Sequence, residues 1–385
     1  MMTVEHLLTK THSTYFKNGK VILCHELDEG YRFTSKKITN LCTGEIQPFC
    51  LDTFKEFLEK FNLRKDYDLP IVFNFHYEVG SILELGEVPL DDIILFDYLK
   101  FTKSEELDLK PFAELIDLKI VSQISRDEYF EKFFQVNQNL LDGNCYQLNL
   151  TSVFDLSFKC PASKLYQKFL SSEKLSQYAH SIYIENFNSL ILSNSPECLF
   201  EIVDNELYTR PIKGTLSDKL DLTLLIDDEK NNCELSIITD LLRNDLSRIG
   251  NSFSEVVNNK QVFKVPGLYH QYSEIKVKLD DVVNLLRVME SLFPGGSITG
   301  APKKRVLKLI NLIEKQSRGV YTGSTIILHE KIKTSSINIR TAFIDIEKSN
   351  ITYGAGGGIT LMSKCDDEYD EMISKVQSFT SIFNC

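Results

Sequence analysis

The chain has 385 residues and a formal net charge of −11, from 43 Lys and Arg against 54 Asp and Glu. This acidic balance, with only short basic runs, argues against broad nucleic-acid binding. No apolar run is long enough to span a bilayer and the N-terminus lacks a signal-peptide pattern, so we expect a cytoplasmic protein without a membrane partner. Nine scattered cysteines without a CxxC pair indicate reduced thiols.

The predicted elements divide the chain into two regions. Residues 1–121 mix short apolar runs with polar turns, and we interpret them as a divergent N-terminal region that packs into the same fold as residues 122–385. A helix is predicted to begin after Ser125, because an N-cap serine followed three residues later by Glu128 forms a capping box. Strand-like segments follow this helix, and Gly143 lies near its expected end.

The later part of the chain alternates groups of strands with longer helices. Helices are predicted near 229–248, 280–293, 303–315 and 366–379, and late strands near 324–330, 335–347 and 350–356. Because the strands come in groups and do not alternate strictly with helices, the pattern predicts an α+β fold with large antiparallel sheets.

A lysine stands in a turn of Pro and Gly at a predicted strand end, in Arg210-Pro-Ile-Lys213-Gly-Thr215. The turn could aim Lys213 into a cleft, where a neutral amine would serve as a nucleophile. A solvated loop lysine is the alternative interpretation of this segment taken alone.

Two glycine-rich segments are candidates for binding anions. Residues 293–303 (FPGGSITGAPK) lead into a predicted helix, where backbone amides and the helix N-terminus favour negative charge; a tight turn is the alternative. Residues 353–359 (YGAGGGI) could present a row of amides to a carboxylate. Neither segment has the Walker or the dinucleotide-binding pattern.

Carboxylates recur on two predicted helices. Glu368, Glu371 and Lys375 fall on one face of the last helix. Glu234 lies at the edge of the apolar stripe of the 229–248 helix. Carboxylates brought together from two helices would suit Mg²⁺, although carboxylates are common on any helix surface.

Three single residues are further candidates for the chemistry of a site. Glu197, in Ser-Pro-Glu, could act as a general acid, and Arg340 could bind a carboxylate with its planar fork of donors. His270 is a candidate of the same kind, and a structural role is the alternative for each of them.

Taken together, these segments resemble one family of chorismate-using enzymes, which includes anthranilate synthase component I and aminodeoxychorismate synthase component I. The resemblance extends from about Ser125 to the C-terminus, and its motifs occur in the same order: CYQLNL, SPE, RPIKGT, DLLRNDLSRIG, FPGGSITGAPKKR, RGVYTGS, INIRT, GAGGGI and EYDEMISKV. It implies a fold of two large antiparallel sheets packed as a sandwich with helices outside. It also implies a small dicarboxylate substrate.

Within this family, the resemblance implies amination of chorismate at carbon 4, for 4-aminobenzoate and folate synthesis. Lys213 stands where aminodeoxychorismate synthases carry lysine and anthranilate synthases carry alanine, and Gln147 replaces the lysine base of isochorismate synthases. Ammonia is expected from a separate glutamine amidotransferase subunit. Anthranilate synthase component I is the alternative enzyme, and a non-catalytic scaffold for a glutaminase is the alternative outside enzymes.

The resemblance also implies roles for individual residues. Lys213 would be the nucleophile, Glu197 the general acid and His270 the family's catalytic histidine. Glu234 and Glu371, with Glu368, would hold Mg²⁺. The substrate-binding set implied by the motifs is Thr215, Thr299, Gly300, Tyr321, Arg340, Gly356, Gly357, Gly358 and Lys375.

The sequence departs from the family pattern at three places. Asn231 occupies a position that is often acidic three residues before the metal glutamate, and Tyr269 replaces the first residue of a usual His-His pair. The N-terminal region lacks the segments that build the family's tryptophan pocket, so we expect no tryptophan binding.

Overall fold

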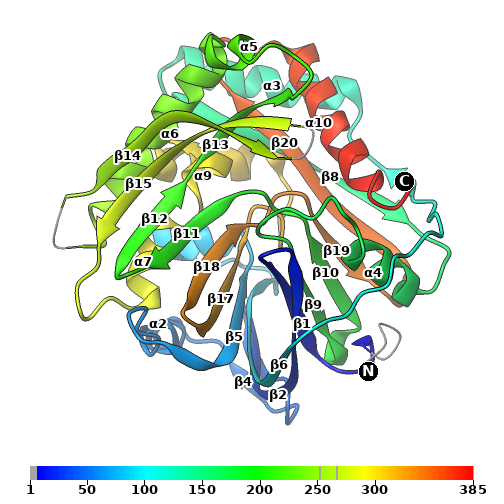
Figure 1. Ribbon diagram of the computed structural model, residues 1–385. Coiled ribbons are helices and arrows are strands. Elements are labelled where there is room, and N and C mark those ends of the chain that lie inside the picture. The colour runs from blue at the N-terminus through cyan, green and yellow to red at the C-terminus, as the bar shows by residue number, and fades with distance from the viewer. Residues whose placement is uncertain (1–6, 251–252, 266–267, 385) are drawn as a thin grey trace.

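The computed structural model describes residues 7–250, 253–265 and 268–384, and its helices surround a large sheet (Figure 1). The helical segments are α2 (Leu51–Glu59), η1 (Ser81–Leu85), α3 (Arg126–Leu141), α4 (Ala162–Leu170), η2 (Glu185–Phe187), α5 (Thr223–Ile226), α6 (Glu229–Leu246), α7 (Leu285–Leu292), α8 (Gly296–Thr299), α9 (Lys303–Glu314) and α10 (Cys365–Thr380). No helix in this described part is long and apolar enough to cross a membrane.

The strands are paired antiparallel throughout. They are β1 (His12–Lys17), β2 (Lys20–Thr34), β3 (Lys37–Asn40), β4 (Ile46–Pro48), β5 (Tyr67–Phe75), β6 (Ile94–Glu106), β7 (Lys119–Ser122), β8 (Gln147–Ser157), β9 (His180–Ile184), β10 (Ser189–Ser193), β11 (Cys198–Val203), β12 (Glu206–Arg210), β13 (Ile212–Ser217), β14 (Glu255–Val265), β15 (Leu268–Lys278), β16 (Gly300–Ala301), β17 (Ser324–Glu330), β18 (Ile332–Ile337), β19 (Thr341–Asp345) and β20 (Asn350–Ile359).

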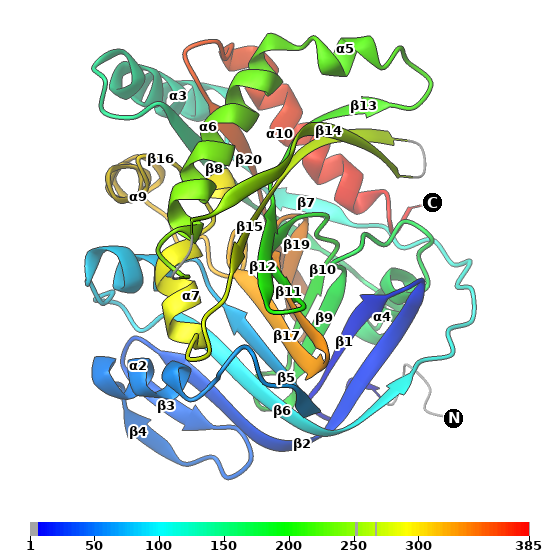
Figure 2. The same ribbon diagram turned by 60° about the vertical axis from the view of Figure 1, so that its left-hand side comes forward.

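These strands form one continuous sheet that curls into a half-barrel, with the long strand β2 between its two arms (Figure 2). One arm runs from β2 through β1, β9, β10, β19 and β20 to β8. The other runs from β2 through β6, β5, β17, β18, β11 and β12 to β15. The α+β prediction is confirmed, but the prediction of two separate sheets is wrong, because β2 is paired with both arms.

The continuity depends on how β2 bends. Its pairing with β6 shifts register between Leu27 and Glu29, which marks an irregularity of the bulge type. A bulge adds local twist, so this strand of 15 residues can bend while it stays paired with β6 along one edge and with β1 along the other. Strands of the N-terminal region thereby pair with later ones, as β1 does with β9 and β5 with β17. The boundary at residue 121 stays a prediction.

Four helices cover the end of the sheet where the predicted site residues lie, as Figure 1 shows for α3, α6, α9 and α10. Helix α10 packs on β20, α9 on β8, and α6 on β13 and β15. In α6 the buried side chains Leu235, Ile238 and Leu242 recur at helical spacing and hold the helix against the sheet. Glu234, four residues before Ile238, lies on the same face of the helix and is also buried.

The helix after Ser125 begins as predicted, because the Ser125 hydroxyl accepts a hydrogen bond from the Glu128 amide at 3.2 Å. Helix α6 ends two residues earlier than predicted, and α7 begins only after its N-cap Asn284. The strand predicted for 335–347 is split into β18 and β19. The break includes Arg340, whose φ of 52° lies in the left-handed region and cannot continue a strand.

Candidate functional site

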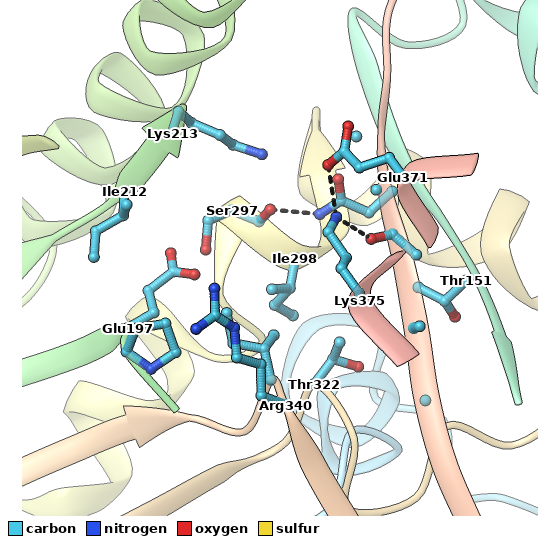
Figure 3. Close-up of a pocket in the computed structure, with 18 of the residues that line it drawn as sticks. Thr151, Glu197, Ile212, Lys213, Ser297, Ile298, Thr322, Arg340, Glu371 and Lys375 are labelled. Carbon is cyan, nitrogen blue, oxygen red and sulfur yellow. Dashed lines mark hydrogen bonds and ion pairs between the residues drawn. The ribbon is translucent and has the colours of Figure 1, made fainter. Parts of the chain in front are cut away.

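A cavity of about 590 Å³ lies between α6, α10 and the ends of β8, β13 and β20, a volume suited to a small ligand. Residues from distant parts of the chain face it from several sides (Figure 3). The predicted site residues that line it are Glu197, Lys213, Glu234, His270, Tyr321, Arg340, Gly356, Gly357, Gly358, Glu368, Glu371 and Lys375. The structure therefore brings most of the predicted set into one place.

Thr299 and Gly300 are not among the residues that line this cavity. The Thr299 side chain is fully buried, and its hydroxyl donates to the Gly295 carbonyl at 2.8 Å. Gly300 has a φ of 137° and pairs with β8, where a Cβ atom would lie 2.1 Å from the Gln147 carbonyl oxygen. Close backbone packing explains this glycine. The Thr215 side chain lies outside the described part of the structure, although its backbone belongs to β13.

Several lining residues were missed by the sequence prediction, among them Asn149, Thr151, Lys230 and Ser297. Asn149 and Thr151 alternate along β8, so both turn their side chains to the same face of the sheet. The alternation of polar and apolar residues in Gln147–Thr151 was the available signal. Ser297 lies in the short helix α8, where no sequence pattern distinguishes it from Thr299.

Glu197 is buried at the cavity wall, 5% exposed, just before β11. Its amide donates to the Ser195 hydroxyl at 3.2 Å, which fixes the backbone. Burial raises the pKa of the Glu197 carboxyl, while Ser297 and the Lys213 ammonium act in the opposite direction. One of its oxygens, Oε1, has no hydrogen-bond partner in the described part of the chain. A carboxyl group with a raised pKa and an uncommitted oxygen is suited to donating a proton to a ligand.

Ion pairs join lysines to the carboxylates of the cavity. Lys213 Nζ lies 3.3 Å from Glu234 Oε2. Lys230 Nζ lies 2.5 Å from Glu368 Oε1, and Lys375 Nζ lies 2.9 Å from Glu371 Oε1. Figure 3 shows Lys213 reaching in from one side of the cavity and Glu371 with Lys375 from the other. Each predicted metal ligand is thus paired with an ammonium group.

The imidazole of His270 is buried, and burial lowers its pKa, with the neighbouring Arg340 guanidinium adding to the effect. His270 is therefore neutral near pH 7. Arg340 lines the same cavity, and its guanidinium makes no hydrogen bond or ion pair with the described residues. A partly buried guanidinium whose N–H donors are unused can bind a ligand carboxylate.

The glycines of β20 lie where one edge of the strand has no partner strand among the described residues. Strand β19 pairs with β20 only as far as Tyr353, whereas β8 continues to Ile359. Beyond Tyr353, successive amides alternate between β8 and the open edge. The Gly356 carbonyl accepts a hydrogen bond from Lys375 Nζ at 2.6 Å, which places Gly356 on the open edge. At most alternate amides of the predicted row can therefore face a ligand.

The donor set of the cavity fits a hard cation such as Mg²⁺. Glu234, Glu368 and Glu371 supply carboxylate oxygens, and Mg²⁺ needs only one or two of these with water and ligand oxygens. The side-chain oxygen Oδ1 of Asn149 lies beside Gly358, has no hydrogen-bond partner among the described residues, and is a further oxygen ligand for such a cation. In the described residues, no three His, Cys, Asp or Glu side chains are gathered closely enough to hold a metal as they stand.

Most of the chain matches known proteins. Residues 97–381 match the family model of the chorismate binding enzymes. The chain is 34% identical over 372 residues to aminodeoxychorismate synthase component 1 of Escherichia coli K12, a match that covers 85% of this chain and 81% of that protein. It is 35% identical over 267 residues to the protein of the same name from Salmonella typhimurium, and there it spans 57% of the relative's length.

A solved structure supports the fold. The crystal structure of anthranilate synthase component I from Streptococcus pneumoniae superposes with a TM-score of 0.78 at 21% identity, covering 93% of this chain and 91% of that one. At this identity the likeness establishes the fold only. From the family match over residues 97–381 and the identity to the Escherichia coli protein, the chain belongs to the chorismate binding enzyme family.

Proposed function

We propose that this chain is the chorismate-aminating component of an aminodeoxychorismate synthase, which converts chorismate and ammonia to 4-amino-4-deoxychorismate for 4-aminobenzoate and folate synthesis. The observation that carries the proposal is the position of Lys213. Its amine lines the same cavity as the buried Glu197 and the uncommitted Arg340, where a lysine is available to attack a bound ring. The relatives named above support the same activity.

In the proposed mechanism, the Lys213 ammonium first loses its proton to solvent. The resulting amine bonds to ring carbon 2 of chorismate, and the double bonds shift as the carbon-4 hydroxyl leaves. Glu197 donates the proton with which that hydroxyl departs as water, which is the role its raised pKa supports. Ammonia then bonds to carbon 4, the double bonds shift back, and the Lys213 amine is expelled. Glu197 takes back a proton from the new carbon-4 ammonium group, Lys213 is regenerated, and the enolpyruvyl group is retained.

The remaining residues of the cavity hold the substrate and the cation. Arg340 and Tyr321 would bind one carboxylate, and the Gly356 amide and Lys375 the other; Lys375 would exchange its present contacts for the ligand. Glu234, Glu368 and Glu371 would hold Mg²⁺, which neutralises charge on the ring carboxylate when bound. Neutral His270 would donate or accept a hydrogen bond beside Arg340.

We assign the supply of ammonia to a separate glutamine amidotransferase subunit, as the resemblance implies. The test is product analysis with the purified chain, chorismate, Mg²⁺ and a high ammonium concentration at mildly alkaline pH. A product that aminodeoxychorismate lyase converts to 4-aminobenzoate is expected. Fluorescent anthranilate would contradict the role given to Lys213, and no turnover with or without the partner would favour a non-catalytic scaffold.

A further inference from the structure

Lys230, in the first turn of α6, lies between two carboxylates that come from different helices. Its Nζ is 2.5 Å from Glu368 Oε1 on α10 and 3.9 Å from Glu234 Oε1 on α6. The two carboxylates are buried, with side chains 2% and 6% exposed, whereas the Lys230 side chain is 31% exposed. An ammonium group therefore occupies a position between oxygens of both helices.

The charges of the cavity balance without a metal. Lys213, Lys230 and Lys375 are each paired with a carboxylate of the set Glu234, Glu368 and Glu371. Glu234 and Glu368 are buried, and buried carboxylates without partners are strongly destabilising, so Lys213 and Lys230 stabilise this side of the cavity. Of the three, Lys230 alone lies within 4.0 Å of two of these carboxylates in the described part of the chain.

We propose that Lys230 is a built-in substitute for the cation: its ammonium holds Glu234 and Glu368 together in the metal-free protein and is displaced when Mg²⁺ binds. The identity of the cation rests on the proposed function. A divalent ion and an ammonium cannot share the same carboxylate oxygens without strong repulsion, because unit charges about 4 Å apart interact by several kcal/mol at partly buried sites. The partly exposed Lys230 side chain has a route to solvent, which the buried carboxylates lack.

Displacement has a consequence for the substrate. Once Lys230 leaves Glu234 and Glu368, its positive charge is available to an anionic ligand in the cavity that it lines. Binding of Mg²⁺ and of a dicarboxylate would therefore strengthen each other, as reciprocal linkage requires. The exchange makes Lys230 a positioning residue for the metal site, with no direct part in bond formation.

The first test is calorimetric titration of the full chain with Mg²⁺ alone, in the absence of chorismate. Lys230→Met removes the competing ammonium and keeps the aliphatic length, so it should tighten Mg²⁺ binding at least about tenfold, a gain that corresponds to about 1.4 kcal/mol. Lys264→Met is the matched control, because it removes the same charge from an exposed lysine that pairs with Asp218. It should leave the affinity near that of wild type.

The second test uses the wild-type chain and needs no variant to fold. Lysine acetylation by a limiting reagent, followed by mass spectrometry, should show Lys230 reacting several-fold faster with Mg²⁺ than without, and Lys264 in the same sample should react at an unchanged rate. Unchanged or slower Lys230 labelling with Mg²⁺ bound would overturn the proposal.

The calorimetric outcomes separate this inference from the proposed function. If Mg²⁺ binds wild type and Lys230→Met equally, or binds the variant more weakly, Lys230 does not compete with the cation and the inference is wrong. If Mg²⁺ binds none of the proteins, the assignment of the metal in the proposed function fails, and the inference fails with it.

Discussion

The guanidinium of Arg318 donates to both carboxylate oxygens of Glu314, at 2.9 Å from Nε and 2.6 Å from Nη2, directly behind the cavity wall. The same guanidinium donates to the carbonyls of Ile298 and Asn149, and Glu314 accepts from the Thr151 amide. All three of these partners line the cavity. The buried pair therefore ties α8, α9 and β8 together and fixes the wall against which a ligand would lie.

Replacing Arg318 with Met should destabilise the protein by about 3–5 kcal/mol, because it leaves the Glu314 carboxylate buried without its charge partner. Urea unfolding measures the difference. The double variant Arg318→Met/Glu314→Leu removes both charges and should recover part of the loss. A single variant within about 1 kcal/mol of wild type, or a double variant no more stable than the single one, would show that this ion pair does not hold the wall.

Glu197→Gln should lower kcat by about 10²–10⁴-fold, because the amide cannot supply the proton that leaves with the hydroxyl. In wild type the reaction needs the protonated carboxyl, whose pKa burial raises. Activity should therefore fall as the pH rises through this elevated pKa. A pH–rate profile in ammonium buffers of fixed free-ammonia concentration measures it, and a fully active Glu197→Gln variant would remove Glu197 from the mechanism.

The same carboxyl should also make stability depend on pH. Because its pKa is higher in the folded than in the unfolded state, the folded protein binds more protons above the ordinary pKa of Glu, and stability falls as pH rises through that window. Glu197→Gln should thus be more stable than wild type at the alkaline end. Glu206→Gln is a control with the opposite expected effect. Tyr208 and Lys276 lower the pKa of Glu206, so removing its carboxylate should decrease the stability of the protein at neutral pH. Melting temperatures across pH compare the variants.

Arg340→Lys should raise the KM for chorismate by about 10–100-fold with a smaller effect on kcat, since an ammonium cannot reproduce the two-point contact of a guanidinium with a carboxylate. Steady-state kinetics with saturating ammonia measure both constants. Arg243→Lys on the exposed face of α6, where Arg243 pairs with Asp240, is the matched control and should behave as wild type. An unchanged KM for Arg340→Lys would mean that the guanidinium does not contact the substrate.

Site residues whose position depends on a local motif could be predicted from the sequence. Site residues whose position depends on tertiary packing could not. Lys213 and Glu197 sit in short segments with Pro or Gly, whose backbone is largely determined locally. The resemblance implies Thr299 as a substrate-binding residue, but Ser297 lines the cavity in its place. Side chains two positions apart in a helix point about 200° apart, and α8 packs against β8 with Ser297 turned toward the cavity.

The shape of the sheet was equally beyond local reasoning. The alternation of hydrophobic residues in β2 predicts a strand. It does not predict that one edge of this strand pairs with β1 and the other with β6, which joins both arms into one curled sheet. The long hairpin of β14 and β15 was not predicted, and its pairing with β13 places His270 opposite Thr215. The lysine partners of the carboxylates also come from tertiary structure, because Lys230 and Glu368 are 138 residues apart.

The most direct test of the account is whether Lys213 forms a covalent bond with the substrate. The chain is incubated with chorismate and Mg²⁺ without ammonia, quenched, digested and examined by mass spectrometry. We predict a mass increase of one chorismate less one water on the peptide that contains Lys213, absent in Lys213→Ala and lost when ammonium is added before quenching. A Lys213→Ala variant that still forms the wild-type product at the wild-type rate would contradict the account.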